Sequence, residues 1–330
     1  MLLASAAIAP AVAQSDWKIA KIMKVGGEGG FDYLTVDSAS HRLFVPRTTH
    51  TMVLDADTGK VLGDIPGQKN AHGVAVVPSL GRGFITDGGG SGAIVIFDLK
   101  TYAVLGTLTT VPDSDGIIYD AALNRVLAVA GDSGVLMTFK PDIDPQNGKI
   151  DPLIQLGGAP EFLASDGSGK IYINLEDKDV VAVVDIKTRT VVARWPVAPG
   201  GHPVGMSMDP KTHRLFVGCR KPQKLVVMSS ETGKVLADLP IGAGVDATKF
   251  DAGLAFASCR DGSFFVMEEK AGKYAIAQTV KTPVVAKTMG VDPATHKVYL
   301  PTAEFEDQPA GSTSRPKAKP DTFMVVVIAR

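Results

Sequence analysis

The stretch AHGVAVVPSLGRGFITDGGGSGAIVIFDLKTYAVLGTLT, residues 71–109, contains four short apolar runs. The runs cover residues 73–77, 83–86, 93–97 and 103–109. The gaps between them are rich in Gly, Pro, Ser and Asp, which is the composition of tight turns. Runs of this length with such short connections predict four β-strands that follow one another in antiparallel fashion.

The same four-strand pattern recurs along the chain. A basic residue opens the second strand of most repeats, at spacings of 40, 43, 45, 44 and then 83 residues, and the last gap holds one further repeat: Arg42, Arg82, Arg125, Lys170, Arg214, Lys297. Third strands are predicted seven times: 51–54, 93–97, 135–139, 180–185, 225–228, 264–267, 323–328. Four strands every 40 to 45 residues or so are typical of β-propeller blades. The sequence therefore predicts an all-β fold, a single β-propeller of seven four-stranded antiparallel blades.

The last repeat has no fourth strand before the chain ends at Arg330. An additional strand is predicted instead near the other end, over residues 17–25 (WKIAKIMKV). Pairing it with residues 323–328 would cover two sheet edges that are otherwise open to aggregation. We expect residues 14–330 to form one domain, closed by this N-terminal strand pairing into the last blade.

Two segments lie outside the repeats. Residues 1–13 (MLLASAAIAPAVA) are apolar and end in the Ala-x-Ala pattern of signal peptides, which predicts cleavage before Gln14 and a periplasmic or secreted protein. No segment reaches the roughly 18 apolar residues of a membrane-spanning helix. Residues 306–321 (EDQPAGSTSRPKAKPD) interrupt blade seven, and their composition predicts either a solvated loop or a flap over one face.

Particular motifs resemble a known family. Residues 71–76 (AHGVAV), residues 181–185 (VAVVD) and the TGKV turns at 58–61 and 232–235 resemble the YVTN-repeat, YncE-like β-propeller family. The resemblance extends over nearly all of the chain from Trp17 onward and implies the same fold. It implies no single activity, because related propellers include binding proteins, lactonase-like hydrolases, a lyase and the shells of redox cofactor enzymes.

Composition limits the partners and the cysteine chemistry. The 34 Lys and Arg residues against 35 Asp and Glu give a net charge of −1, so no strong field attracts nucleic acid, and we expect a monomer without a nucleic-acid partner. Cys219 and Cys259 occupy matching positions in successive repeats. Equivalent positions on neighbouring blades usually exceed the Cα separation of about 5.5 Å that a disulfide prefers. We therefore predict two buried free thiols in preference to a disulfide.

The first residues of the inner strands define a candidate site. All inner strands start at one face of a propeller, so side chains at this position converge on the axis. In blade order the position holds Asp32, His72, Asp115, Glu161, Val204, Asp246 and Lys287, six of which are ionisable. Nearby residues and the loops after the second strands add Tyr33, His202, Arg47, Arg220 and Arg260. Convergent ionisable groups in a concavity predict a ligand site, although Asp at such positions also bonds turn backbone.

Several chemistries remain open for this set. The possible metal ligands are Asp32, His72, Asp115, Glu161 and Asp246. The carboxylates suit Ca²⁺ or Mg²⁺, and an imidazole pair of His72 and His202 with one carboxylate suits Zn²⁺. Without metal, His72 beside Asp115 could act as a general base in lactone opening or β-elimination. The leading interpretation is an exported binding or scaffold protein for a small ligand or a protein partner. The alternative is a metal-assisted or His-dependent hydrolase or lyase.

Overall fold

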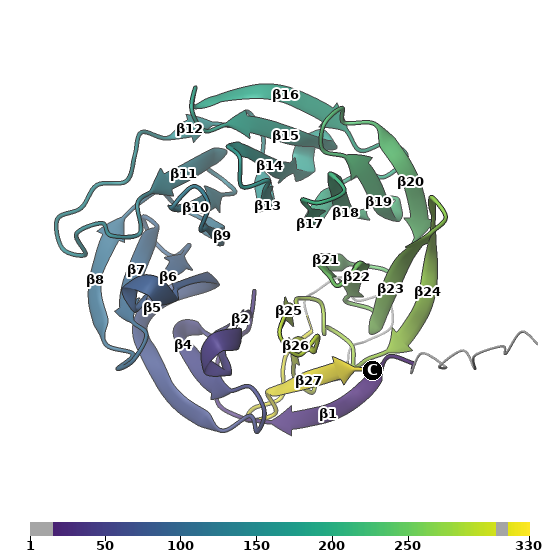
Figure 1. Cartoon of the computed structure of the whole chain (residues 1–330). Helices are drawn as coiled ribbons and strands as arrows, with labels where there is room; N and C mark the ends of the chain where they lie inside the picture. Colours follow the sequence, from purple (N-terminus) through teal and green to yellow (C-terminus); the bar gives the residue numbers. More distant parts are fainter. Residues whose placement is uncertain (1–15, 308–315) are drawn as a thin grey trace, which may run out of the picture.

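The protein is an all-β propeller. The structure, a computed structural model, describes residues 16–307 and 316–330, so the predicted signal peptide and part of the predicted loop lie outside the described residues. Antiparallel sheets are arranged around a central channel, with one strand of each blade nearest the axis and one at the rim (Figure 1). None of the described helices is long and apolar enough to cross a bilayer.

Five four-stranded sheets occur in the described part of the chain. From the axis outward, one sheet contains β9 (Ser114–Asp120), β10 (Arg125–Ala130), β11 (Val135–Phe139) and β12 (Ile154–Gln155), and the next contains β13 (Pro160–Ser165), β14 (Lys170–Leu175), β15 (Val180–Asp185) and β16 (Thr190–Pro196). A third contains β17 (Pro203–Asp209), β18 (Arg214–Arg220), β19 (Gln223–Ser229) and β20 (Val235–Pro240), and a fourth contains β21 (Val245–Asp251), β22 (Leu254–Cys259), β23 (Ser263–Lys270) and β24 (Lys273–Lys281). The fifth contains β25 (Gly290–Val291), β26 (Val298–Thr302), β27 (Met324–Ala329) and β1 (Lys18–Lys24).

The remaining sheet differs from the expected pattern because it has seven strands. It contains β2 (Thr35–Asp37), β3 (Arg42–Pro46), β4 (Thr48–Asp55), β5 (Val61–Val77), β6 (Arg82–Asp87), β7 (Ala93–Asp98) and β8 (Val104–Thr109). The sequence predicts a fourth strand at 61–65 and a separate first strand at 73–77, but β5 runs through both as one extended segment of 17 residues. The strands therefore do not divide into seven separate four-stranded sheets, because β5 pairs with both β4 and β6.

The N-terminal strand pairs with the last strand of the chain. β1 is antiparallel to β27, with Lys18 opposite Ala329 and Lys24 opposite Met324, and the two strands lie side by side in Figure 1. Met23 of β1 is 3% exposed and belongs to an apolar cluster with Met52 and Phe323. This pairing buries apolar surface from opposite ends of the sequence.

The turn before each second strand has a recurring backbone conformation. The residue just before the strand has a positive φ between 49° and 82° in five repeats: His41, Gly81, Asn124, His213, Gly253. His296, two residues before β26, has a φ of 58°. Gly and Asn adopt this left-handed region most readily, and His is enriched there as well. The sequence predicts His41, His213 and His296 as turn residues, because each occupies an equivalent position before a basic residue, and their backbone conformations confirm this.

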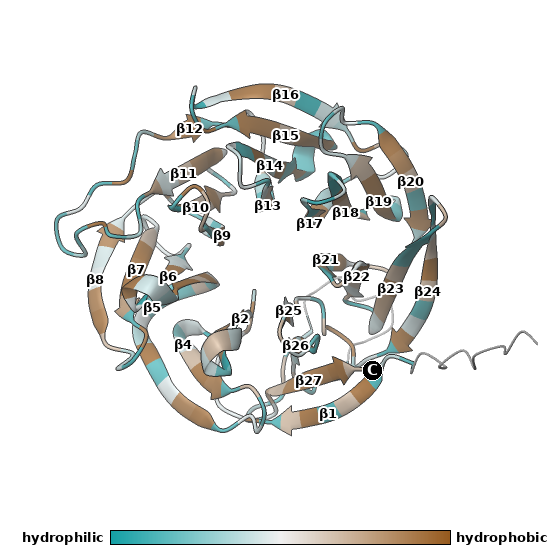
Figure 2. Ribbon diagram, viewed as in Figure 1, coloured by the Kyte–Doolittle hydropathy of each residue, from teal (hydrophilic) through white to brown (hydrophobic). Residues whose placement is uncertain are grey.

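The core lies between the faces of neighbouring sheets. Second and third strands are buried on both faces, which explains their continuous apolar runs, such as Ile94 to Phe97. In Figure 2 the third strands β15 and β27 are brown, whereas the rim strands mix brown and teal. Cys219 is the second-last residue of β18 and Cys259 the last of β22, and both are buried and free. Burial raises the pKa of each thiol to about 12. The prediction of buried, unbridged cysteines is confirmed.

Two neighbouring residues of β1 test how firmly this strand is docked. Met23→Ala removes a buried side chain and should lower the free energy of unfolding by about 2–4 kcal/mol. Ile22→Ala changes a side chain that is 44% exposed on the same strand, so its cost should stay near 0.5 kcal/mol. Urea denaturation measures both, and equal effects would contradict docking of β1 against the core.

Candidate functional site

A cavity of about 710 Å³ lies at the mouth of the channel where the inner strands start. It brings together ten of the eleven residues proposed from the sequence: Asp32, Tyr33, Arg47, His72, Asp115, Glu161, Arg220, Asp246, Arg260, Lys287. They come from different blades, which explains why no local motif joins them. His202 is the exception and does not line the cavity. A volume of this size is ordinary for a small-ligand site.

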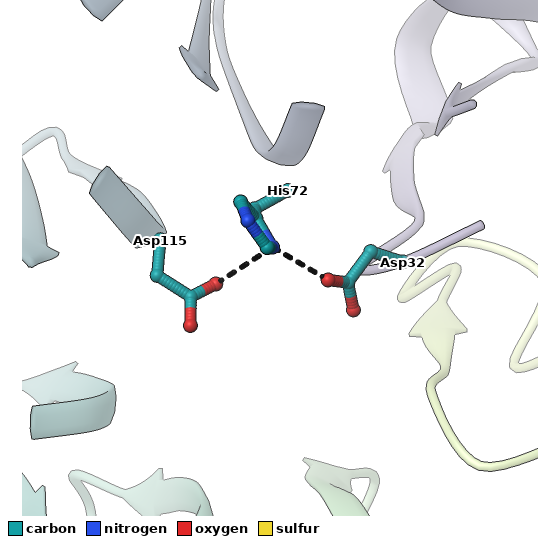
Figure 3. Close-up of side chains that lie close together, drawn as sticks. All are labelled: Asp32, His72 and Asp115. Carbon is teal, nitrogen blue, oxygen red and sulfur yellow. Dashed lines mark hydrogen bonds and ion pairs between the residues drawn. The ribbon is translucent and has the colours of Figure 1, made fainter. Parts of the chain in front are cut away.

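His72 of β5 lies between two carboxylates, Asp32 from the segment before β2 and Asp115 from β9 (Figure 3). Its Nδ1 is 2.8 Å from Asp32 Oδ2 and 3.4 Å from Asp115 Oδ1. Its Nε2 is 2.8 Å from the side-chain amide of Asn70. Burial by itself would lower the pKa of His72, but the hydrogen bond to Asp32 and the charges of Asp115, Asp32 and Asp113 raise it to about 9. The imidazole is therefore positively charged at neutral pH.

Asp115 is the least satisfied member of this group. Burial and the negative charges of Asp32 and Asp113 raise the pKa of its carboxyl to about 7, although the positive charge of His72 acts to lower it. Its Oδ1 is buried and accepts no hydrogen bond from the described residues, leaving only the longer contact with His72. Buried polar atoms are rarely left without a partner. Asp115 thus lines the cavity with a carboxyl group whose hydrogen bonding is incomplete among the described residues.

The opposite arc of the cavity is basic. The Asp246 side chain is only 5% exposed and lies between Arg220, whose Nη2 is 2.5 Å from Oδ1, and Lys287, whose Nζ is 2.5 Å from Oδ2. Burial would raise the pKa of Asp246, but the charges of Lys287 and Arg220 outweigh it and lower the pKa. Two cations thus share one carboxylate, so this pair of contacts leaves excess positive charge on the arc.

Glu161 and His202 are joined through a third residue. Burial, the charge of Asp115 and a hydrogen bond with Glu176 raise the pKa of Glu161 to about 9, so its carboxyl is protonated at neutral pH. The other contact of Glu176 is His202, with Oε2 3.0 Å from Nε2. His202 therefore lies behind Glu161, and the predicted pairing of His202 with His72 as two metal-binding imidazoles does not occur.

Arg47 positions a wall of the cavity and is not free to face a ligand. Its guanidinium donates to the carbonyls of Gly30 at 2.8 Å and Gly27 at 3.0 Å, and it stacks 3.9 Å from the centre of the Phe323 ring. The side chain is 1% exposed, and burial lowers its pKa to about 10, which still leaves it charged at neutral pH. Arg47 thus holds the glycine-rich segment 26–30 in place.

This wall was not predicted from the sequence. Gly27 to Phe31 and Pro316 to Asp321 both line the cavity, and Asp321 Oδ1 accepts a hydrogen bond of 2.7 Å from the Gly27 amide. The run GGEGG at 26–30 is the signal that could have indicated it, since Gly26, Gly27 and Gly29 all have positive φ. The described part of the predicted 306–321 loop therefore lies over one face.

Tyr33 forms the floor of the cavity. It is 8% exposed, and its ring packs 4.8 Å from that of Phe162, centre to centre. Burial raises the pKa of its hydroxyl well above the ordinary value, and the charges of Asp246 and Asp115 add to the effect. The hydroxyl therefore stays protonated.

Three of the five possible metal ligands come close together. Ligand atoms of Asp32, His72 and Asp115 all lie within 4.8 Å of one another. Glu161 is protonated and bonded to Glu176, and Asp246 is neutralised by Arg220 and Lys287, so neither is available to a cation. A metal at this point would have one imidazole and two carboxylates as protein ligands.

Comparison with known proteins shows the fold and nothing finer. No protein family and no curated protein sequence matches this chain. Among solved structures, a chain of the Kuenenia stuttgartiensis hydrazine synthase is similar with a TM-score of 0.72 and 13% identity, covering 84% of this chain and 93% of that one. The chain is a β-propeller. A chain of the mitotic checkpoint complex (TM-score 0.75, 12% identity, 91% and 93% covered) and U3-55K (0.76, 11%, 94% and 99%) support the same fold.

The Asp32 contact with His72 can be tested by titration. Asp32→Asn removes a negative charge and should lower the pKa of His72 by about 1 to 2, which NMR of the imidazole measures. Because the folded pKa exceeds the unfolded value of about 6.5, the pair stabilises the fold fully at pH 5 to 6.5 and the contribution is lost as pH rises through about 9. The stability difference between wild type and Asp32→Asn should shrink over that range.

The matched control is Asp64→Asn, since Asp64 lies 3.6 Å from a different imidazole, His50. It should leave the titration of His72 unchanged. An unaltered His72 pKa in Asp32→Asn would show that the hydrogen bond in Figure 3 does not control the charge of the ring.

Proposed function

We propose that this protein is an exported β-propeller that binds a small hydroxylated carboxylate at the mouth of its channel. The division of charge in the cavity carries this proposal. One arc holds Arg220 and Lys287 around a single carboxylate, which suits a ligand carboxylate. The other arc holds Asp32, His72 and Asp115, with Asp115 Oδ1 lacking a hydrogen-bond donor among the described residues, which suits a ligand hydroxyl.

The charge of His72 favours binding over His-dependent catalysis. A general base must be unprotonated, and at pH 7 a group with a pKa of about 9 is unprotonated in only about one molecule in a hundred. A charged imidazole held by two carboxylates acts instead as a fixed hydrogen-bonding group. Its role in this proposal is to orient Asp32 and Asp115 toward the ligand.

The finer architecture is part of the same proposal. We interpret the seven-stranded sheet as two blades that share β5, since residues 61–66 pair with β4 and residues 74–77 pair with β6. The ring then has seven blades, as in the YVTN-repeat propellers, and the β1–β27 pairing closes it. We expect a monomer.

The proposal of export depends on the apolar residues 1–13, and mature protein recovered from the periplasm should begin at Gln14.

A metal-assisted hydrolase or lyase is the second candidate, and one observation favours it. The ligand atoms of Asp32, His72 and Asp115 are close enough to share a cation. Nδ1 of His72 already contacts both carboxylates, so a metal would have to displace the ring proton. In the binding proposal, chelator leaves ligand affinity unchanged, whereas stoichiometric metal with turnover of a lactone would favour the second candidate.

Calorimetry with glucuronate as probe and glucose as its neutral counterpart tests the binding proposal. Glucuronate should bind more tightly than glucose. Lys287→Gln should weaken glucuronate binding at least tenfold and leave glucose unaffected, because it removes a cation and leaves Asp246 paired with Arg220. Lys281→Gln, an exposed lysine of the β24 strand, is the matched control and should change neither affinity.

Circular dichroism establishes that both variants are folded. Equal affinity for glucuronate and glucose in the wild type, or unchanged glucuronate binding in Lys287→Gln, would contradict recognition of a carboxylate by the basic arc.

A further inference from the structure

A second cavity lies deeper along the channel, on the other side of Tyr33. Its volume is about 240 Å³, and Tyr33 lines both this cavity and the larger one, so the tyrosine separates them. The walls come from the middle of the inner strands and are mainly apolar: Val74, Val76, Ile117, Ile118, Phe162, Met289. An adjoining hollow of about 290 Å³ shares Leu34, Thr35 and Lys249 with it.

Lys249 of β21 is the one charged side chain among the described residues that line this deeper cavity. Its Nζ lies 4.9 Å from the centre of the Phe162 ring. None of the hydrogen bonds or ion pairs between described residues involves this ammonium group. Lys249 is half-buried, and its burial among these walls lowers its pKa to about 8, as expected for a partly desolvated cation without an anion to pair with.

The other polar groups around Lys249 are engaged or neutral. Asp251, two residues along the same strand and lining the adjoining hollow, pairs with His296, with Oδ2 2.7 Å from Nδ1. Tyr119 donates its hydroxyl to Asn124 at 3.2 Å. Tyr33 stays protonated, since burial raises its pKa. No carboxylate of the cavity wall is therefore available to the ammonium group.

We propose that this deeper cavity binds a medium-chain carboxylate, with the carboxylate group on Lys249 Nζ and the acyl chain against the apolar wall. An isolated ammonium group in apolar surroundings is costly, and a ligand anion removes that cost by pairing with it. The apolar wall selects for a hydrocarbon chain over the hydroxylated ligand proposed for the upper cavity. The two sites therefore differ in chemistry.

Calorimetry with octanoate as probe tests this site. Octanoate should bind with one site per chain, and hexanoate and butyrate progressively more weakly, by about three- to fourfold for each methylene lost. Octanol, which has the chain without the charge, should bind at least tenfold more weakly. Lys249→Met should weaken octanoate binding at least tenfold and leave glucuronate binding at the upper cavity unchanged.

Two comparisons guard against misfolding and nonspecific adsorption. Lys273→Met, an exposed lysine on β24 of the same sheet, should bind octanoate like the wild type. In the wild type at pH 8, titrations in buffers of different ionisation enthalpy should show proton uptake, because pairing with the anion favours protonated Lys249. Unchanged octanoate affinity in Lys249→Met, equal affinity for octanol, or absence of proton uptake would overturn the proposal.

Discussion

The inner strands of successive blades run in the same direction along the channel, so their first residues meet at one mouth. This constraint places side chains from distant parts of the sequence within a few ångströms of one another, as with Asp32, His72 and Asp115. Charged groups brought together in a partly buried space must pair, change protonation or remain unsatisfied. All three outcomes occur around this mouth.

The carboxylate of the basic arc is fully paired, whereas Asp115 on the acidic arc is not. Asp246 has two cationic partners, and its charge is held firmly. Burial and the hydrogen bond with Glu176 raise the pKa of Glu161, so its carboxyl keeps its proton. Asp115 has no comparably close cationic partner, because His72 makes its shorter contact with Asp32. The incomplete pairing is the feature that distinguishes a place for a ligand from a purely structural network.

The sequence predicted the composition of the mouth better than its internal contacts. Alignment of the repeats located Asp32, His72, Asp115, Asp246 and Lys287, because each occupies the same position in its repeat. The structure brings them to one cavity. The residues added from nearby positions were less reliable: His202 has a positive φ of 52°, and its ring contacts Glu176 and does not line the cavity. The sequence also indicated Arg47, from the loop after a second strand, as a ligand group, whereas its guanidinium holds the backbone of the glycine-rich wall.

What the sequence determined by itself was therefore the strand pattern, the turn residues such as His41 and His213, and the set of side chains at the mouth. These follow from local rules: alternation of strands and turns, left-handed turn positions and a repeat of constant length. The tertiary structure alone decided the continuity of β5, the wall formed by residues 27–31 and 316–321, the pairing of each charge and the isolation of Lys249. These depend on distances across the channel between separate blades, which no local pattern encodes.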